Sequence, residues 1–243
     1  MEQNYILLRP GMFAELSTDI EQYPGGIVIP LDKPYRWTSA DAVRKIKFKL
    51  QRHFGRRNLK VGHAGTLDPL ATGLLLICIG KATKQAQCLQ NQTKEYIAEI
   101  QFGATTPSYD LEKEIDATYP WEHITRERIE AVLPKFLGEQ DQVPPIFSAK
   151  LVDGVRAYEY ARQGEEVEMK PARITLHELE ILDYQAPVLT LRIRCSKGTY
   201  IRSIARDLGL ALESGGHLIN LKRTVSGENQ LQNAVSMEEI LNS

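Results

Sequence analysis

The sequence predicts an α+β protein whose sheet is largely antiparallel. Stretches with strand and helix patterns are mixed without the strict alternation of strand and helix that a parallel sheet requires. Residues 93–102 place Tyr96, Ala98, Ile100 and Phe102 on one face, which is the period of a half-buried strand. Two long strands, 173–183 and 188–195, follow one another through Ala186-Pro187 with no helix between them.

The first elements of the chain are a strand and a helix. Gly26–Leu31 is apolar, and its Pro30 indicates a sheet edge or a bulge. Thr38-Ser39 can cap a helix from about residue 40 to residue 54, and Asp41 near its start suits the helix dipole. The apolar residues expected partly on one face of this helix are Val43, Ile46, Phe48 and Leu50.

A loop at residues 62–73 follows, between a short strand (59–61) and a buried strand (74–79). Its glycines, proline and threonines predict a loop by composition. The loop holds one imidazole, His63, and one carboxylate, Asp68. Because Pro69 disfavours helical backbone at Asp68, the carboxylate should be presented in a fixed direction, as in an active site. An ordinary Asp-Pro turn is the alternative.

The remaining elements continue the mixture. We expect turns at residues 103–110 and at Lys197-Gly198. Ser214-Gly215-Gly216 should end the helix that begins near residue 200. The sequence predicts helices at 81–89, 124–136, 156–162, 200–213 and 236–241, a short strand after Pro144-Pro145, and a final strand at 217–225.

The composition is that of a globular protein. Of the 243 residues, 42% are hydrophobic and 25% are charged. The three cysteines are far apart, which argues against a disulfide framework or a structural zinc site and for a reducing, cytoplasmic setting. Residues 1–24 lack a signal-peptide core and are assigned as an N-terminal extension to a domain at 25–243, and no apolar run is long enough to span a membrane.

Charge is segregated along the chain despite a net charge of −1. Residues 33–60 carry ten Lys/Arg against one acid, whereas residues 108–141 carry nine acids against four bases. Local basic patches of this kind attract phosphates, although a solvated helix face explains residues 44–49 equally well.

Five segments, in this order, resemble the TruB-type tRNA pseudouridine synthases. The resemblance extends from about Gly26 to the C-terminus. It implies a central mixed, mainly antiparallel sheet flanked by helices. It also implies isomerisation of one uridine in the T-loop of tRNA (position 55) to pseudouridine, with no cofactor, no metal and no obligate protein partner. The segments are Gly62–Gly73, Lys94–Tyr96, Pro144–Lys150, Arg156–Glu159 and Cys195–Arg202.

The resemblance also implies roles for single residues. Asp68 would be the nucleophile, Arg202 the arginine that keeps it ionised, and Tyr96 a residue that stacks on the flipped-out base. The substrate-binding residues would be His63, Tyr96, Tyr200, Leu221 and Lys33. Lys222 and Arg223, with the basic stretch at 33–60, would hold phosphates of the T-arm.

Three departures from the family pattern stand out. Arg36 occupies a position where glycine is usual, and Pro107 one where aspartate is common. The chain stops at Ser243 without the small C-terminal RNA-binding (PUA) domain of many relatives, which predicts weaker RNA binding. Two other functions remain open: an RNA-binding protein without chemistry, and an aspartate-dependent glycosidase, which would ordinarily need a second placed carboxylate.

Overall fold

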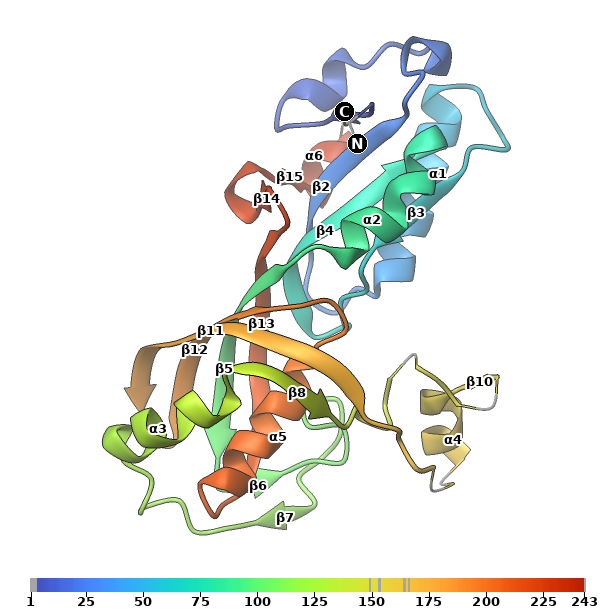
Figure 1. The fold of residues 1–243 in the computed structure, drawn as a ribbon. Coiled ribbons are helices and arrows are strands. Elements are labelled where there is room, and N and C mark those ends of the chain that lie inside the picture. Colours follow the sequence, from blue (N-terminus) through green and yellow to red (C-terminus); the bar gives the residue numbers. More distant parts are fainter. Residues whose placement is uncertain (1–3, 149, 153, 164, 166, 243) are drawn as a thin grey trace. The chain divides into compact units, whose positions relative to one another are not determined.

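The structure is a computed structural model that describes residues 4–148, 150–152, 154–163, 165 and 167–242 (Figure 1). Ala149, within the Pro144–Lys150 motif, lies outside the described residues. The chain divides into two compact units. The first unit consists of Met1–Tyr96 and Lys222–Ser243, and the second of Ile97–Leu221. Strands β5 (Lys94–Phe102) and β13 (Gly216–Ser226) have residues in both units.

The first unit contains short helices around a set of strands. Its strands are β1 (Ile6–Leu7), β2 (Ile27–Lys33), β3 (Val61–Ala64), β4 (Ala71–Ile79), β14 (Asn229–Gln230) and β15 (Val235–Ser236). Its helices are α1 (Ser39–His53), α2 (Ala86–Asn91), α6 (Met237–Asn242) and the 3₁₀ helices η1 (Met12–Glu15), η2 (Ile20–Gln22), η3 (Gly80–Gln85) and η5 (Leu231–Asn233).

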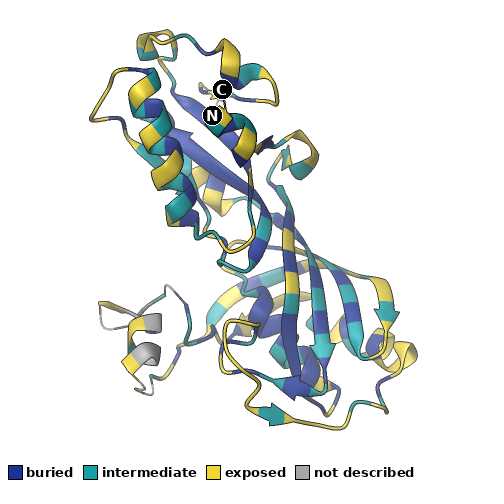
Figure 2. Ribbon diagram, turned by 180° about the vertical axis from the view of Figure 1, so that it is seen from behind, coloured by how far each residue is buried: buried dark blue, intermediate teal, exposed yellow. Residues whose placement is uncertain are grey.

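The strands of the first unit form a mixed sheet in the order β1-β2-β4-β13. Strand β2 pairs in parallel with β1 and β15 and antiparallel with β4, and β3 also pairs antiparallel with β4. Residues 73–79 of β4 are all buried, and Figure 2 shows strands of this unit dark along their length. A strand buried on both faces has layers on both sides, which explains its continuous apolar sequence.

Helix α1 begins where its sequence predicts. Thr38 is the N-cap, and Thr38 and Asp41 form a capping box. Ile46 and Leu50 are buried, but the expectation for Phe48 is wrong, because its side chain is 56% exposed. A residue two positions after Ile46 is about 200° around the helix from it, so both cannot face the core.

The second unit contains the other strands and helices. Its strands are β6 (Ala104–Thr105), β7 (Ala117–Thr118), β8 (Gly138–Gln142), β9 (Leu151–Val152), β10 (Val155–Arg156), β11 (Ala172–Gln185) and β12 (Val188–Cys195). Its helices are α3 (Arg126–Val132), η4 (Leu133–Phe136), α4 (Ala157–Gln163) and α5 (Ile201–Ala211).

The main sheet of the second unit has the order β13-β5-β12-β11-β8. Strand β11 pairs antiparallel with both β12 and β8. Strand β5 alternates buried and half-buried residues, which confirms the expected alternation. The α+β class with a mixed, mainly antiparallel sheet is therefore confirmed.

One element near Pro144 differs from the sequence-based expectation. Strand β8 precedes the prolines and was not predicted, because Gly-Glu-Gln-Asp-Gln has no apolar alternation. The short strand expected after the prolines is β9, which pairs with β10, whereas residues 146–148 before it form bends. The carbonyl groups of Val143 and Phe147 accept hydrogen bonds from side chains of α5, so this segment is held without a strand partner.

Candidate active site

Asp68 lies on the short connection between β3 and β4, in the first unit. It is half-buried, and its backbone carbonyl accepts a hydrogen bond from the Ala71 N–H at 3.1 Å. The strands extend further into the predicted loop than expected, since β3 reaches Ala64 and β4 begins at Ala71. The carboxylate therefore sits on a tight connection anchored at both ends, which limits the directions it can take.

The N-terminus of α1 fixes the residue before Asp68. The hydroxyl of Ser39 accepts a hydrogen bond from the Leu67 N–H at 2.8 Å and donates one to the Leu67 carbonyl at 3.0 Å. Ser39 is buried, so water does not compete for these two bonds. One side chain thus satisfies both backbone groups of the residue next to Asp68.

Lys33, at the end of β2, fixes the residue after Asp68. Its side chain is fully buried, and its ammonium donates to the carbonyls of Pro34 (2.9 Å), Trp37 (2.5 Å) and Pro69 (3.5 Å). Burial lowers the pKa of Lys33 to about 8, an effect that Asp68 partly opposes. The ammonium is occupied by backbone of its own unit, so it supports the turn and the loop from inside.

We expect Lys33 to make stability depend on pH. The unfolded chain keeps the proton up to about 10.5, whereas the folded chain loses it at about 8. Between these values the unfolded state binds more protons, so the free energy of unfolding should rise with pH. Urea denaturation at pH 8 and pH 10 would measure this rise, which should be smaller in Lys33→Met. Equal pH dependence in both proteins would contradict the assignment.

Arg223, on β13, holds the other side of the loop, and it is only 1% exposed. Its guanidinium donates to the carbonyls of Leu74 (2.6 Å), Gly65 (3.0 Å) and Thr66 (3.5 Å). The expectation that Arg223 binds RNA phosphates is therefore wrong, because its donors are used on the Asp68 loop. Lys222 beside it is exposed, as a phosphate-binding residue must be.

Two glycines let the chain make this connection. Gly65 has φ +96° and Gly73 has φ +95°, a region that other residues rarely adopt. At Gly73 a Cβ atom would lie 2.4 Å from the Arg223 carbonyl oxygen. Gly73 is therefore required both by its backbone conformation and by the close approach of β13.

His63 lies on β3, five residues before Asp68, and is half-buried. Its Nδ1 is buried and has no hydrogen-bond partner among the described residues. Burial, and then the charge of Arg223, lower the pKa of His63. A neutral imidazole with an apolar face is suited to stacking on a nucleobase.

Tyr96 ends the first segment of the first unit and lies on the buried phase of β5. It is 8% exposed, which places its ring among core residues of the sheet. Leu221 is the last residue of the second unit, lies on β13 and is 7% exposed.

Arg202 lies in the second unit, in the first turn of α5, and is 3% exposed. Its Nε is 3.8 Å from a carboxylate oxygen of Asp110, which is itself buried. The same guanidinium donates to the carbonyls of Phe147 (2.9 Å) and Ser108 (3.3 Å). The sequence analysis did not single out Asp110, the carboxylate that this buried cation needs.

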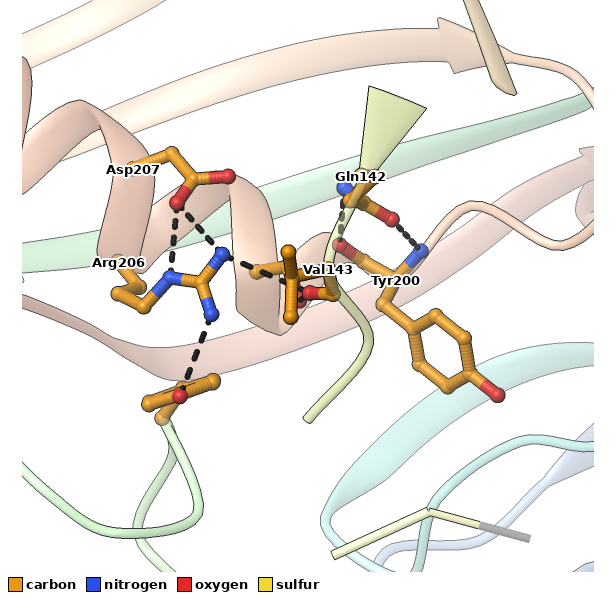
Figure 3. Close-up of polar contacts among 7 residues, drawn as sticks. Gln142, Val143, Tyr200, Arg206 and Asp207 are labelled. Carbon is orange, nitrogen blue, oxygen red and sulfur yellow. Dashed lines mark hydrogen bonds and ion pairs between the residues drawn. The ribbon is translucent and has the colours of Figure 1, made fainter. Parts of the chain in front are cut away.

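Tyr200 is the N-cap residue of α5, and Gln142 holds its backbone. The Gln142 side chain accepts from the Tyr200 N–H at 2.8 Å and donates to the Tyr200 carbonyl at 3.1 Å (Figure 3). Figure 3 also shows the Tyr200 ring directed away from Gln142, and Arg206 bonded to Asp207, both within the second unit. Gln142 was not foreseen, because its partner lies 58 residues away.

The predicted residues thus fall into two groups. Asp68, His63, Lys33 and Tyr96 belong to the first unit, and Arg202, Tyr200 and Leu221 to the second. The pairing of Asp68 with Arg202 stays a prediction.

Basic side chains of the first unit line a cleft of about 530 Å³ beside β3. The one acid that lines it, Glu21, is paired with Arg56 at 2.9 Å. The lining cations are Arg56, Arg57, Lys60, Lys81 and Lys84.

Among the described residues, no group of three or more metal-ligating side chains occurs, and no helix is long and apolar enough to cross a membrane.

Two protein-family models match the chain. The model described as "TruB family pseudouridylate synthase (N terminal domain)" matches residues 51–201, and "tRNA pseudouridylate synthase B C-terminal domain" matches residues 202–243. A tRNA pseudouridine synthase B of Phocaeicola vulgatus is 55% identical over 213 residues, covering 88% of this chain and 91% of that protein. A protein of the same name from Flavobacterium johnsoniae is 53% identical, covering 89% and 95%.

Two solved structures are similar to this chain in both fold and sequence. A chain of a Cbf5-Nop10-Gar1 complex aligns with a TM-score of 0.66 at 29% identity, covering 90% of this chain. A chain of an H/ACA RNP bound to a substrate RNA containing 2'-deoxyuridine aligns with a TM-score of 0.62 at 28% identity. The present chain spans about half the length of each: 54% of the first and 51% of the second.

Proposed function

The chain belongs to the TruB family of pseudouridylate synthases, and on that premise we propose that it isomerises uridine 55, in the T-loop of tRNA, with Asp68 as nucleophile. In this reaction the bond from C1′ to N1 of the base breaks, the base turns, and a bond from C1′ to C5 forms. C5 loses a proton and N1 gains one, so the product is an isomer of uridine and no cofactor is needed to balance the step.

The observation that carries the proposal is the way the Asp68 loop is held. Three buried side chains from three elements bind its backbone: Ser39 from α1, Lys33 from β2 and Arg223 from β13. None of these contacts uses the Asp68 carboxylate. An acid on a backbone fixed this firmly is preorganised for attack, because its position is established before the substrate arrives.

The other site residues would act on the flipped-out nucleoside. Tyr96 would stack on the uracil and take the C5 proton, and His63 would stack on an RNA base as a neutral ring. Tyr200 and Leu221 would shape the pocket. Arg202, whose charge is balanced by Asp110, would stabilise the carboxylate form of Asp68.

RNA phosphates would bind the basic cleft of the first unit, where Arg57, Lys60, Lys81 and Lys84 provide cations that no described acid pairs with. Binding through such contacts weakens steeply with added salt, because salt reduces the free energy gained when counterions leave the phosphates. We expect the RNA substrate to be the T-arm itself, so a T-arm hairpin should suffice for turnover.

We expect the protein to form one pseudouridine per tRNA transcript, at position 55, and also to modify a T-arm hairpin. Chemical mapping of pseudouridine after incubation measures this, and a transcript with cytidine at position 55 is the control. Modification at other positions, or none in either RNA, would refute the assigned site. Comparing total RNA from cells with and without the protein extends the test to all RNAs.

A further inference from the structure

One surface of the first unit combines exposed aromatic rings with cations. Among the described residues of this unit, the large apolar side chains classed as exposed are Ile6 (38%), Tyr35 (50%) and Phe48 (56%). The two aromatic ones each lie under a guanidinium: Arg36 is 5.6 Å from the Tyr35 ring, and Arg52 is 4.6 Å from the Phe48 ring. A cation over a ring face is attracted by the ring quadrupole, so each of these exposed rings is held beside a positive charge.

A cavity of about 380 Å³ is lined by the Phe48 ring and by the ring of Trp37, the residue after Arg36. Its lining residues recur at intervals of three or four positions, so they form one stripe along α1 and the turn before it. They are Trp37, Asp41, Arg44, Lys45 and Phe48. We call these five residues, with Tyr35, Arg36 and Arg52, the α1 patch.

The α1 patch carries a net positive charge. Its one acid, Asp41, accepts hydrogen bonds from the Thr38 hydroxyl (2.6 Å) and N–H (3.2 Å) and pairs with Arg44 at 3.0 Å. Hydrogen bonding to Thr38 lowers the pKa of Asp41, which stays ionised and largely occupied. Lys45, Arg36 and Arg52 remain to attract an anion.

The α1 patch adjoins the Asp68 loop through the turn before α1. The Arg36 N–H donates to the Pro69 carbonyl at 2.8 Å, and the Trp37 carbonyl accepts from Lys33. Arg36 has φ 64°, a left-handed conformation that is unfavourable for a non-glycine residue. An exposed arginine kept at a strained position next to the nucleophile's loop points to a role for its side chain.

We propose that the α1 patch binds an unpaired nucleobase of the RNA substrate, other than the target uridine, by stacking it on Phe48 and Trp37. Arg52 and Lys45 then contact the adjoining phosphates. Every base has a π-face and a neighbouring phosphate, so aromatic rings interleaved with cations match it better than they match an apolar peptide. The inference rests on the proposed function, because it assumes an RNA substrate.

Trp37 provides a direct readout of stacking. The chain has two tryptophans, so Trp121→Phe leaves Trp37 as the single indole, and Asp68→Asn prevents turnover. We expect the Trp37 fluorescence of this double variant to fall as a T-arm hairpin is added. Hairpins with an abasic nucleotide at each loop position in turn should identify one base whose removal abolishes the quench. Bound hairpins that leave the fluorescence unchanged, or a quench that no abasic position reduces, would overturn the proposal.

Phe48→Ala tests the same contact by affinity. Because Phe48 is exposed, the variant should fold, and we expect its Kd for the T-arm hairpin to rise about tenfold with an unchanged maximal rate. Leu210→Ala, which removes another exposed apolar side chain from a helix outside the α1 patch, is the matched control and should leave the Kd unchanged.

The outcomes separate this inference from the proposed function. If wild-type protein modifies position 55 and Phe48→Ala binds RNA as tightly as wild type, the α1 patch does not bind a base while the enzyme assignment stands. If Phe48→Ala instead dissociates a dimer in sedimentation without changing the Kd, the patch joins two copies of the chain and the inference is wrong. If wild type modifies no uridine, the proposed function itself fails.

Discussion

Asp68→Asn is expected to lower the rate of pseudouridine formation by at least about a thousandfold while leaving RNA binding within about twofold of wild type. The amide has the shape of the carboxylate but is not a nucleophile. The loop itself should be undisturbed, since Ser39, Lys33 and Arg223 bind backbone groups and not the Asp68 side chain. Single-turnover assays on a T-arm hairpin, with filter binding in parallel, measure both quantities.

Asp32→Asn is the matched control for this variant. Asp32 is exposed, and like Asp68 it raises the pKa of Lys33 electrostatically, so both substitutions remove one negative charge near the same ammonium. We expect Asp32→Asn to retain activity. Equal losses in the two variants would mean that charge near Lys33, and not the Asp68 nucleophile, explains the effect. Activity of Asp68→Asn within tenfold of wild type would refute the catalytic assignment.

Gly73→Ala should be the most destabilising conservative change in the loop, with a loss of about 3 kcal/mol or more in the free energy of unfolding. The residue has φ +95°, and a Cβ atom would meet the backbone carbonyl oxygen of Arg223 at 2.4 Å. Backbone cannot rotate away as a side chain can, so β13 and its Arg223 would have to shift. Urea denaturation measures the loss, and the rate of pseudouridine formation should fall with it.

Gly62→Ala is the control from the same hairpin. No atom lies within 4 Å of its ideal Cβ, and its φ is outside the left-handed region. We expect its stability to lie within about 1 kcal/mol of wild type. Similar stabilities for the two variants would show that the approach of β13 to Gly73 does not constrain the loop.

Local patterns were enough to predict the parts of the site that depend on neighbouring residues. Thr38 and Asp41 mark the start of α1, the alternation of residues 93–102 gives β5, and glycines with Pro69 mark the loop that carries Asp68. These signals depend on residues only a few positions apart, so they can be read without knowing the contacts of the rest of the chain.

Contacts between distant residues could not be predicted in this way. Arg223 has the sequence context of a surface cation, and only carbonyls 149 to 158 positions earlier explain its burial. Asp110 pairs with Arg202 of α5, and Gln142 bonds the backbone of its N-cap Tyr200, and both are also distant from α5 in the sequence. Phe48 shows the reverse case, because an apolar residue expected partly on the core face of α1 lies outside the core.

The position of Arg223 in the chain has a consequence for biosynthesis. Arg223, which binds the Gly65 and Leu74 carbonyls, is synthesised 149 to 158 residues after them. Strand β15, which pairs with β2, is synthesised after Arg223. A nascent polypeptide exposes the Asp68 segment early, together with Ser39 and Lys33, but lacks the Arg223 restraint until β13 leaves the ribosome. Completion of the Asp68 loop is thus coupled to late translation, and chains shortened before β13 would emerge with the acid present but without one of the three side chains that hold its loop.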